Sequence, residues 1–324
     1  RILRRNESIK KACDAGFPEE KLIFLDADEH IRDILATYRP DAIITKESGD
    51  SGGFDEKTSD ALEAGVGVYV VKRPSLCAKF ITVTGEYGLR REVERLVPGF
   101  FELRSGFTSG SCATAAAKAA LLALLGKRPI ESVSFTIPNG EVMSMPVALA
   151  RSDGERGYAE VVKEAGDDPD VTQHARIGAE VRLATHGCIR HFGGEGVGKV
   201  TLPGLGLPVG DPAINMVPRQ MIADALLSLA PQGCDVTISV AGGEELAQKT
   251  FNPRVGVVGG ISIVGTTGIV IPLSHEAFID TIRREMEVAA ASGVVAVVIN
   301  SGARSEKTVK RLYPELPPQA FVHY

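Results

Sequence analysis

The chain has 324 residues, of which 44% are hydrophobic and 24% charged, and its formal net charge is -5. These are ordinary globular values apart from a generous 35 glycines, and they exclude a disordered chain, a collagen and a coiled coil. Because there is no basic excess, no binding to nucleic acid is expected. The longest apolar runs fall far short of the roughly 20 residues that cross a bilayer, so no membrane span is expected either.

The length favours two domains, and the pattern changes near residue 100. The five cysteines are odd in number and form no Cys-x-x-Cys pair, which argues against a disulfide framework or a zinc ribbon and favours the cytoplasm. The sequence begins at Arg1, inside what looks like a basic helix, so we expect a chain cut from a longer one.

The first hundred residues alternate short β-branched runs with helical stretches, which predicts βαβ units and a parallel sheet. Strands are expected at 22–25, 42–45 and 66–71, and helices at 29–38 and 56–64. The second strand runs into a glycine-rich loop, where Lys46, Ser48 and the Gly49 amide could hold a phosphate at the carboxyl edge of the sheet. A plain surface loop with glycine turns is an equally good interpretation.

Residues 40–54 (PDAIITKESGDSGGF) and 70–74 (VVKRP) resemble the C-terminal half of the cobalt-precorrin-6A reductases of cobalamin biosynthesis, the CbiJ/CobK family. The resemblance implies that an N-terminal half, with its own glycine-rich dinucleotide loop, would precede residue 1. NAD(P)H is therefore expected only for a complete reductase segment.

In the second part, Thr108–Ser111 is the predicted start of an alanine- and leucine-rich helix over 113–125, because Ser and Thr are good N-caps. Free amides and the helix dipole there would attract a carboxylate or a phosphate. The alternative is a plain capped helix. Cys112 lies in the first turn, where the dipole would favour a thiolate unless the side chain is simply small and buried.

Residues 193–199 have the spacing of the start of a P-loop, G-x-x-x-x-G-K. Val200 stands where the magnesium-binding Ser or Thr belongs, and Pro203 prevents the helix that must follow, so we exclude an ATPase. The glycine stretch remains a place where the backbone could approach a ligand closely.

Arg219 falls in the first turn of a helix expected around 220–229, where it opposes the dipole unless an anion neutralises it. A solvated arginine is the alternative. Residues 250–270 contain two short β runs separated by Gly-Gly and Gly-Thr-Thr-Gly, loops suited to hydrogen-bonding carboxylates or a ribose, or else tight turns. Further elements are expected as a strand at 234–240, a helix at 243–249, a helix capped by Ser274 that runs to residue 291, and a strand at 294–300. No metal-ligand spacing and no Ser-His-Asp order is present among the histidines.

Four ordered motifs carry a second resemblance: residues 104–113 (RSGFTSGSCA), 194–201 (GEGVGKVT), 212–219 (PAINMVPR) and 250–270. They look like the cobalt-precorrin-5B C1-methyltransferases, the CbiD family. The resemblance implies S-adenosylmethionine as the methyl donor and a cobalt-corrin tetrapyrrole as the acceptor, in anaerobic cobalamin biosynthesis. Because the family continues past the position of Tyr324, we expect a C-terminally truncated domain.

The predicted fold is thus an α/β Rossmann-like half-domain over residues 1–100, the C-terminal part of a reductase-like domain, followed by a larger α+β CbiD-like domain over 103–324. Methyl transfer is an in-line displacement that needs positioning above all, so no catalytic residue and no metal is assigned. The candidate substrate-binding residues are Thr108, Ser109, Gly110, Ser111, Asn215, Arg219, Asn252 and Arg254. The candidate cofactor-binding residues are Gly194, Glu195, Gly196, Gly198, Gly259, Gly260, Ser262, Gly265, Thr266, Thr267 and Gly268, with Lys46, Ser48 and Gly49 in the first part.

Two alternatives stay open. The chain could be bifunctional, with cobalt-precorrin-6A reductase activity beside methyl transfer, or it could be a corrin-binding remnant without catalysis. A homo-oligomer is compatible with either.

Overall fold

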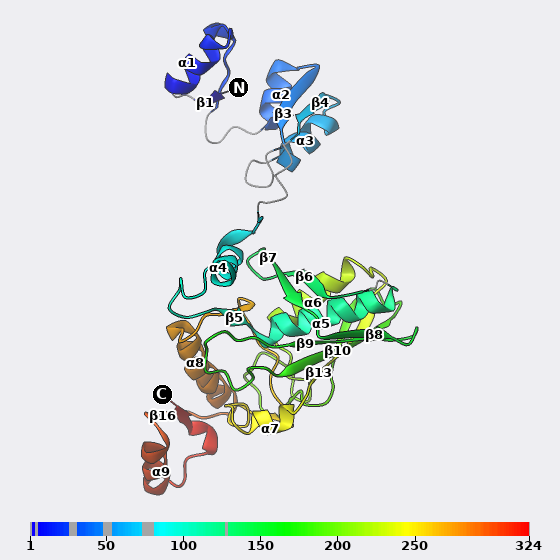
Figure 1. Cartoon of the computed structure of the whole chain (residues 1–324). Coiled ribbons are helices and arrows are strands. Elements are labelled where there is room, and N and C mark those ends of the chain that lie inside the picture. The colour runs from blue at the N-terminus through cyan, green and yellow to red at the C-terminus, as the bar shows by residue number, and fades with distance from the viewer. Residues whose placement is uncertain are drawn as a thin grey trace. The chain divides into compact units, whose positions relative to one another are not determined.

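The computed structural model describes residues 2–3, 6–25, 31–47, 54–72, 81–126 and 129–323, and it is a mixed α/β protein (Figure 1). By compactness the chain separates between Ile81 and Thr82 into two units, which are described in turn below. No helix in the described ranges is long and apolar enough to cross a bilayer.

The first unit alternates strands and helices in the order expected. Its elements are β1 (Ile2–Leu3), α1 (Asn6–Asp14), the 3-10 turn η1 (Glu19–Lys21), β2 (Phe24–Leu25), α2 (Ile31–Tyr38), β3 (Ala42–Lys46), α3 (Phe54–Glu63) and β4 (Gly67–Val71). β1 pairs with β2 and β3 with β4, both in parallel, as two separate two-stranded sheets in this part of the described chain. The parallel pairing agrees with the sequence pattern, whereas the Rossmann-like arrangement stays a prediction.

The second unit contains the larger core. Its first half comprises α4 (Gly85–Leu96), β5 (Gly106–Phe107), α5 (Ser109–Leu124), β6 (Ser132–Thr136), β7 (Val142–Pro146), β8 (Leu149–Ser152), β9 (Gly157–Val162), β10 (Arg176–Leu183) and β11 (Ile189–Gly193). The second half comprises β12 (Lys199–Val200), α6 (Met216–Leu227), β13 (Cys234–Val240), α7 (Gly243–Ala247), β14 (Val257–Val258), β15 (Ile269–Val270), α8 (His275–Ala291), β16 (Val298–Asn300), α9 (Ala303–Leu312), the turn η3 (Pro318–Ala320) and β17 (Phe321–His323).

The main sheet of this unit has five strands in the order β11-β13-β10-β9-β8. β13 has the bounds that the sequence predicted, and its side chains alternate between buried and partly buried. It pairs antiparallel with β10, from Ile177 opposite Val240 to Leu183 opposite Cys234, and parallel with β11. The period of two therefore aims one apolar face of the sheet at the core.

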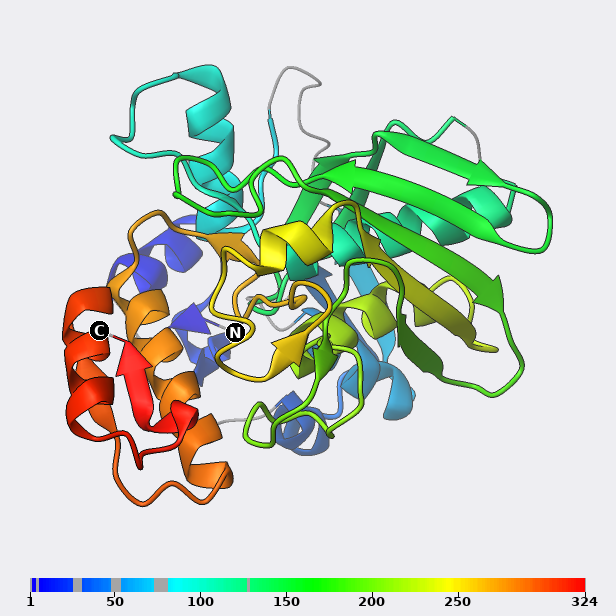
Figure 2. The same ribbon diagram turned by 90° about the horizontal axis from the view of Figure 1, so that it is seen from below.

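Helix α5 covers that face, and almost all of its length is buried (Figures 1 and 2). Its alanines bring the helix so close to the sheet that a Cβ placed on Gly157 of β9 would lie 1.9 Å from the Ala120 carbonyl oxygen. Similarly, a Cβ on Gly110 would lie 2.7 Å from Cγ of Pro218 on the neighbouring α6. Small residues on both sides are thus what allows this helix to pack at backbone distance.

Helix α4 belongs to the larger unit because residues near both of its ends form hydrogen bonds with other residues of that unit. Glu141, before β7, accepts hydrogen bonds from the Glu86 and Gly88 amides at 3.0 Å each, which satisfies the first turn of the helix. Glu94 accepts from the Ser105 amide and hydroxyl at 2.9 and 3.0 Å. The domain boundary that the sequence predicts between residues 100 and 103 remains a prediction.

The elements after residue 274 form a group of their own, in which β16 pairs in parallel with β17 and α8 and α9 pack against them (Figures 1 and 2). As the sequence predicted, Ser274 caps α8, its hydroxyl accepting a hydrogen bond from the Ala277 amide.

A buried histidine on β11 makes the stability of the fold depend on pH. The Nε2 atom of His191 is buried and has no hydrogen-bond partner among the described residues. Burial, reinforced by the nearby Arg219 guanidinium, lowers the pKa of His191 to about 4. In the unfolded chain this histidine is protonated below about pH 6.5, whereas in the folded chain it is protonated only below about pH 4. Between these two values the unfolded chain binds more protons, so the free energy of unfolding decreases as the pH falls.

We expect the free energy of unfolding to decrease between pH 6.5 and 4 more steeply in the natural protein than in His191→Asn, by up to about 1.4 kcal/mol per pH unit for one linked proton. Urea denaturation across this range measures the slope. His275→Gln, at an exposed histidine, is the matched control and should keep the natural slope. Equal slopes for the natural protein and His191→Asn would contradict the assignment.

Candidate functional site

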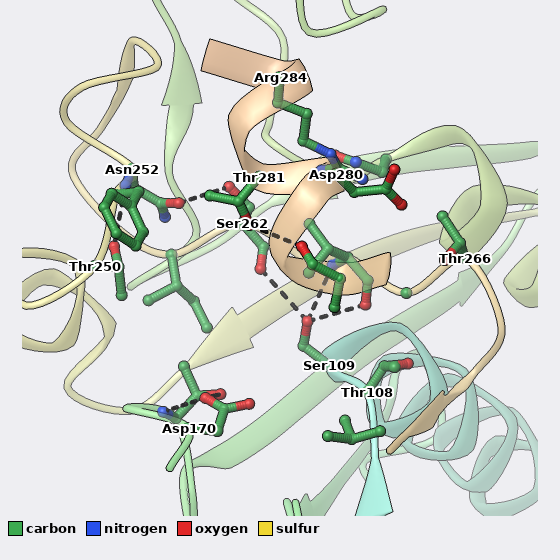
Figure 3. A pocket seen from close by; sticks show the side chains of 18 of the residues that line it. Thr108, Ser109, Asp170, Thr250, Asn252, Ser262, Thr266, Asp280, Thr281 and Arg284 are labelled. Carbon is green, nitrogen blue, oxygen red and sulfur yellow. Dashed lines mark hydrogen bonds between the residues drawn. The ribbon is translucent and has the colours of Figure 1, made fainter. Parts of the chain in front are cut away.

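A cavity of about 640 Å³ opens in the larger unit, where the start of α5, the loops of residues 250–274 and the first turns of α8 meet (Figure 3). Part of its wall is apolar, formed by residues such as Leu205, Leu207 and Ile261. The rest is dense in hydroxyl groups and carboxylates. Its volume is within the usual range for a site that takes a small organic ligand.

The start of α5 supplies one wall. Thr108 is the N-cap, and its Oγ1 accepts a hydrogen bond from the Ser111 amide at 3.2 Å. The Gly110 amide donates to the Val264 carbonyl at 2.8 Å, and the Ser111 hydroxyl donates to the Gly268 carbonyl at 2.6 Å. The Gly110 and Ser111 amides are thus used within the protein, which corrects the expectation of free amides at these two positions. What α5 presents to the cavity is hydroxyl groups.

Ser109 fastens the opposite loop to the helix. Its Oγ accepts from the Val264 amide at 2.9 Å and also lies 3.2 Å from the Val264 carbonyl oxygen, as the dashed lines in Figure 3 mark. Gly265 follows with φ +147°, and a Cβ there would lie 2.2 Å from Oγ1 of Thr108. Only glycine permits this close approach, so the Gly-Thr-Thr-Gly loop is held against the N-cap.

A network of side-chain amide and hydroxyl groups holds the next stretch. The Ser262 hydroxyl donates to Oδ1 of Asn252 at 3.1 Å, and Nδ2 of Asn252 donates to the Gly260 carbonyl at 3.2 Å. Asn215 is the N-cap of α6 and lines the cavity, and its side chain makes no capping hydrogen bond to the described residues.

A buried ion pair that the sequence analysis did not identify lies in the cavity wall. The Lys163 side chain at the end of β9 is 2% exposed, and its Nζ lies 2.6 Å from Oδ2 of Asp170. The other carboxylate oxygen, Oδ1, accepts from the Thr172 amide and hydroxyl at 2.7 and 2.6 Å. Burial would raise the pKa of Asp170, but the Lys163 ammonium and the Thr172 hydrogen bonds outweigh it and hold the pKa below its ordinary value.

Asp170 is therefore a carboxylate at neutral pH, fixed in place and facing a cavity. Further carboxylates line the cavity at Asp168, Glu276 and Asp280. Asp168 accepts from the Leu273 amide at 3.2 Å, and Asp280 pairs with Arg283. Two cationic side chains, Lys163 and Arg284, also line the cavity, so the four carboxylates leave the lining acidic on balance. Such a lining favours a ligand with hydroxyl, amino or cationic groups over one rich in carboxylates.

Many predicted site residues from separate motifs meet in this cavity. They are Thr108, Ser109, Asn215, Asn252, Ser262, Gly265, Thr266 and Thr267. The residues that the sequence analysis missed have no local motif, because a lone lysine at a strand end and an aspartate in a loop become a pair only in the folded chain.

Two predicted arginines lie elsewhere. Nε of Arg219 donates to the Ile214 carbonyl at 2.8 Å, and its Nη2 lies 3.2 Å from Asp211, so a protein carboxylate resolves the conflict with the helix dipole. Arg254 binds Glu306 at 3.1 Å and the Phe321 carbonyl at 2.9 Å. Neither lines the large cavity, and their contact with substrate carboxylates remains a prediction.

The predicted cofactor glycines 194–198 have another use in this structure. A Cβ on Gly196 (φ +72°) would lie 2.0 Å from the Val240 carbonyl oxygen, and one on Gly260 would lie 2.4 Å from the Gly196 carbonyl carbon. The Val240 amide in turn donates to the Glu195 carbonyl at 2.8 Å. What approaches these glycines closely is the protein's own backbone. Gly194, Gly198, Gly259 and Gly268 likewise do not line the cavity.

The remaining predictions concern Cys112 and the first unit. Cys112 is fully buried, and burial raises its pKa to about 12, which corrects the thiolate hypothesis in favour of a small buried side chain. Lys46 ends β3 and is exposed, whereas Ser48 and Gly49 lie outside the described residues. Within the described ranges no group of three His, Cys, Asp or Glu side chains is arranged to hold a metal ion.

Comparison with known proteins finds relatives for both parts. The CbiD family model matches residues 98–272, and the model of the precorrin-6x reductases CbiJ/CobK matches residues 1–89. A cobalt-precorrin-5B C(1)-methyltransferase of Prosthecochloris aestuarii is 52% identical over 231 residues, covering 69% of this chain and 63% of the relative. One from Geobacillus thermodenitrificans is 49% identical over 225 residues, covering 68% and 60% respectively. The chain thus spans roughly three fifths of the length of these curated relatives.

Among solved structures, the chain is similar to the crystal structure of a cobalamin biosynthesis protein (CbiD) from Archaeoglobus fulgidus. The sequences are 31% identical, the match covers 68% of this chain and 70% of that one, and the TM-score is 0.44.

The glycine packing yields a prediction. Gly196→Ala should lower the free energy of unfolding by at least about 2 kcal/mol more than Gly206→Ala, because both glycines have a positive φ but only Gly196 faces backbone atoms, whereas Gly206 has open space. Urea titration measures both. If Gly196 instead faced a ligand, its variant would keep its stability and lose ligand binding alone.

Proposed function

The chain belongs to the CbiD family, and from that membership we propose that it acts in the S-adenosylmethionine-dependent methylation of cobalt-precorrin-5B at C1, in cobalamin biosynthesis. The observation that carries the proposal is the near 50% identity to relatives named for that reaction, over 231 and 225 residues. A cobalt-corrin acceptor and a cytoplasmic location are parts of the same proposal.

We assign the cavity to the methyl donor. S-adenosylmethionine supplies an electrophilic methyl group on a sulfonium cation, and it also carries an amino group and a ribose diol. Fixed carboxylates such as Asp170, together with the hydroxyls of Thr108, Thr266 and Thr281, suit these groups. A corrin ring carries many carboxylates, which the acidic lining would repel.

The chain's contribution to the reaction is then positioning. Methyl transfer in line from sulfur to carbon needs no protein nucleophile, which agrees with a cavity where hydroxyls and carboxylates are already fixed by hydrogen bonds. The Ser109–Val264 contact holds the start of α5 against the loop at residue 264, and the Ser262–Asn252 contact joins two stretches of the cavity wall. The apolar wall at Leu205 and Leu207 would exclude water from the part of a bound ligand that lies against it.

The direct test is mass spectrometry of cobalt-precorrin-5B incubated anaerobically with S-adenosylmethionine and the protein. We expect a gain of one methyl group, both with this chain joined to the C-terminal region of a longer relative and, if the described cavity suffices, with this chain alone. Corrin binding without a gain in either protein would favour the corrin-binding remnant, and neither binding nor gain would contradict the proposal.

The donor assignment predicts the effect of Asp170→Asn. We expect donor affinity, measured by calorimetry with S-adenosylmethionine, to fall about tenfold or more because a charge-assisted contact is lost. Asp153→Asn, in an exposed turn, is the matched control. Because Asp170→Asn leaves Lys163 buried without its counter-ion, the melting temperature is measured as well.

Thr266→Val separates binding from folding. Thr266 is exposed in the cavity wall and has no hydrogen bond to the described residues, so this isosteric change leaves the fold intact. We expect an affinity loss of about fivefold at unchanged melting temperature, as for one lost hydrogen bond. Unchanged affinity in both Asp170→Asn and Thr266→Val would place the donor elsewhere.

The match of residues 1–89 to the reductase family favours a second activity for a longer protein. We propose that residues 1–100 are part of a Rossmann-like reductase domain whose NAD(P)H site requires a further segment. Fluorescence titration with NADPH, of this chain and of a form completed with the N-terminal half of a related reductase, tests this: binding only to the completed form is expected.

A further inference from the structure

A cysteine, a histidine and an aspartate meet at the far edge of the large sheet, outside the cavity. Cys188 precedes β11 and is exposed, and its Sγ lies 3.3 Å from Nδ1 of His186. Nε2 of the same ring lies 3.0 Å from Oδ1 of Asp235 on β13. The three side chains form a line, in which one imidazole touches the thiol on one side and the carboxylate on the other.

The chemistry of these contacts sets the direction of the hydrogen bonds. An ionised carboxylate only accepts, so Nε2 of His186 carries a proton and donates it to Asp235. Nδ1 is then the unprotonated nitrogen, and the thiol of Cys188 donates to it. This is the arrangement in which an oriented imidazole takes a proton from a nucleophile.

The loop that carries the pair is held by backbone contacts. The Ala184 and Gly187 amides donate to the carbonyls of Gly233 and Gln232 at 3.0 and 2.9 Å, and the Cys234 amide donates to the Cys188 carbonyl at 3.1 Å. Gly233 has φ +93°, and a Cβ there would lie 2.5 Å from the Cys188 oxygen. The thiol and the imidazole are thus positioned in advance.

Two arginines flank Asp235 on the neighbouring strands. Arg182 on β10 and Arg190 on β11 are the cross-strand neighbours of Asp235, one on each side. Nε of Arg182 forms an ion pair with Oε1 of Glu180 at 3.4 Å, whereas the Arg190 side chain is exposed. An exposed thiol in contact with a histidine is typical of reactive cysteines. In the described chain these side chains are not arranged as a metal site.

We propose that Cys188 is a reactive thiol that forms a mixed disulfide with small-molecule disulfides, with His186 as the proton acceptor and Asp235 as the group that positions it. The Cys188 proton passes to Nδ1 of His186 while the sulfur attacks one sulfur of the disulfide. The disulfide bond breaks, a new bond forms between Cys188 and that sulfur, and the departing thiolate takes the proton from His186. One thiol is thereby exchanged for another, and the protein cysteine is oxidised at the expense of the small disulfide.

The protein offers an internal control, since Cys13 on α1 is also exposed. The intact chain is treated near pH 7 with dithiodipyridine, which is neutral, or dithiobis(nitrobenzoate), which is anionic, and each cysteine is followed by peptide mass spectrometry. We expect Cys188 to react at least about tenfold faster than Cys13 with both reagents. His186→Gln should bring Cys188 to within about twofold of Cys13, and Asp235→Asn should give an intermediate rate.

Arg190→Gln separates steering from activation, because it should slow the anionic reagent only. Melting temperatures of all variants show whether the fold is kept, and Asp235→Asn retains the shape of the side chain if His186→Gln loosens the loop. Equal rates for Cys188 and Cys13, or a Cys188 rate that neither folded variant changes, would overturn the proposal and leave a structural histidine–aspartate contact.

Discussion

The distance between α5 and the sheet beneath it determines the rest of the larger unit. Ala120 and Gly157 bring the helix and β9 to backbone contact, and Gly110 allows the ring of Pro218 on α6 to approach closely. A helix held this closely has a fixed starting point, so Thr108 and Ser109 lie at one place relative to every strand of the sheet. The loop of residues 262–268 is hydrogen-bonded to that starting point, and it forms a wall of the cavity. Small side chains in a buried helix thus place hydroxyl groups at a ligand site.

Local signals in the sequence predicted the elements well. The alternation in 234–240 gave β13 with its observed bounds, and the capping residues Thr108 and Ser274 gave the starts of α5 and α8. The hydroxyl-rich loops were also predicted as site residues, because their composition already differs from that of ordinary turns. Such signals depend only on neighbours in the chain, which is why they can be found without a structure.

Contacts between distant residues account for what the sequence did not predict. Arg219 and Arg254 carry the same charge whether a ligand or a protein carboxylate neutralises it, and only the fold shows that Asp211 and Glu306 do so. The glycines near Gly196 permit a close approach, but the sequence does not say what approaches, and in the structure it is the carbonyl of Val240. Lys163 and Asp170 belong to no motif and become a site only through their 2.6 Å contact in the cavity wall.

Arg254 connects the cavity wall to the last elements of the chain. Arg254 follows Asn252 of the cavity wall by two residues, and its guanidinium is bound to Glu306 of α9 and to the Phe321 carbonyl of β17. A ligand that ordered the cavity loop would therefore also restrain these late elements, and a partner that restrained α9 or β17 would change ligand affinity in the cavity by the same factor. Occupancy of the site and order at the C-terminal end of the described chain would then be linked equilibria, coupled through the Arg254 guanidinium and through α8, which lines the cavity and packs against β17.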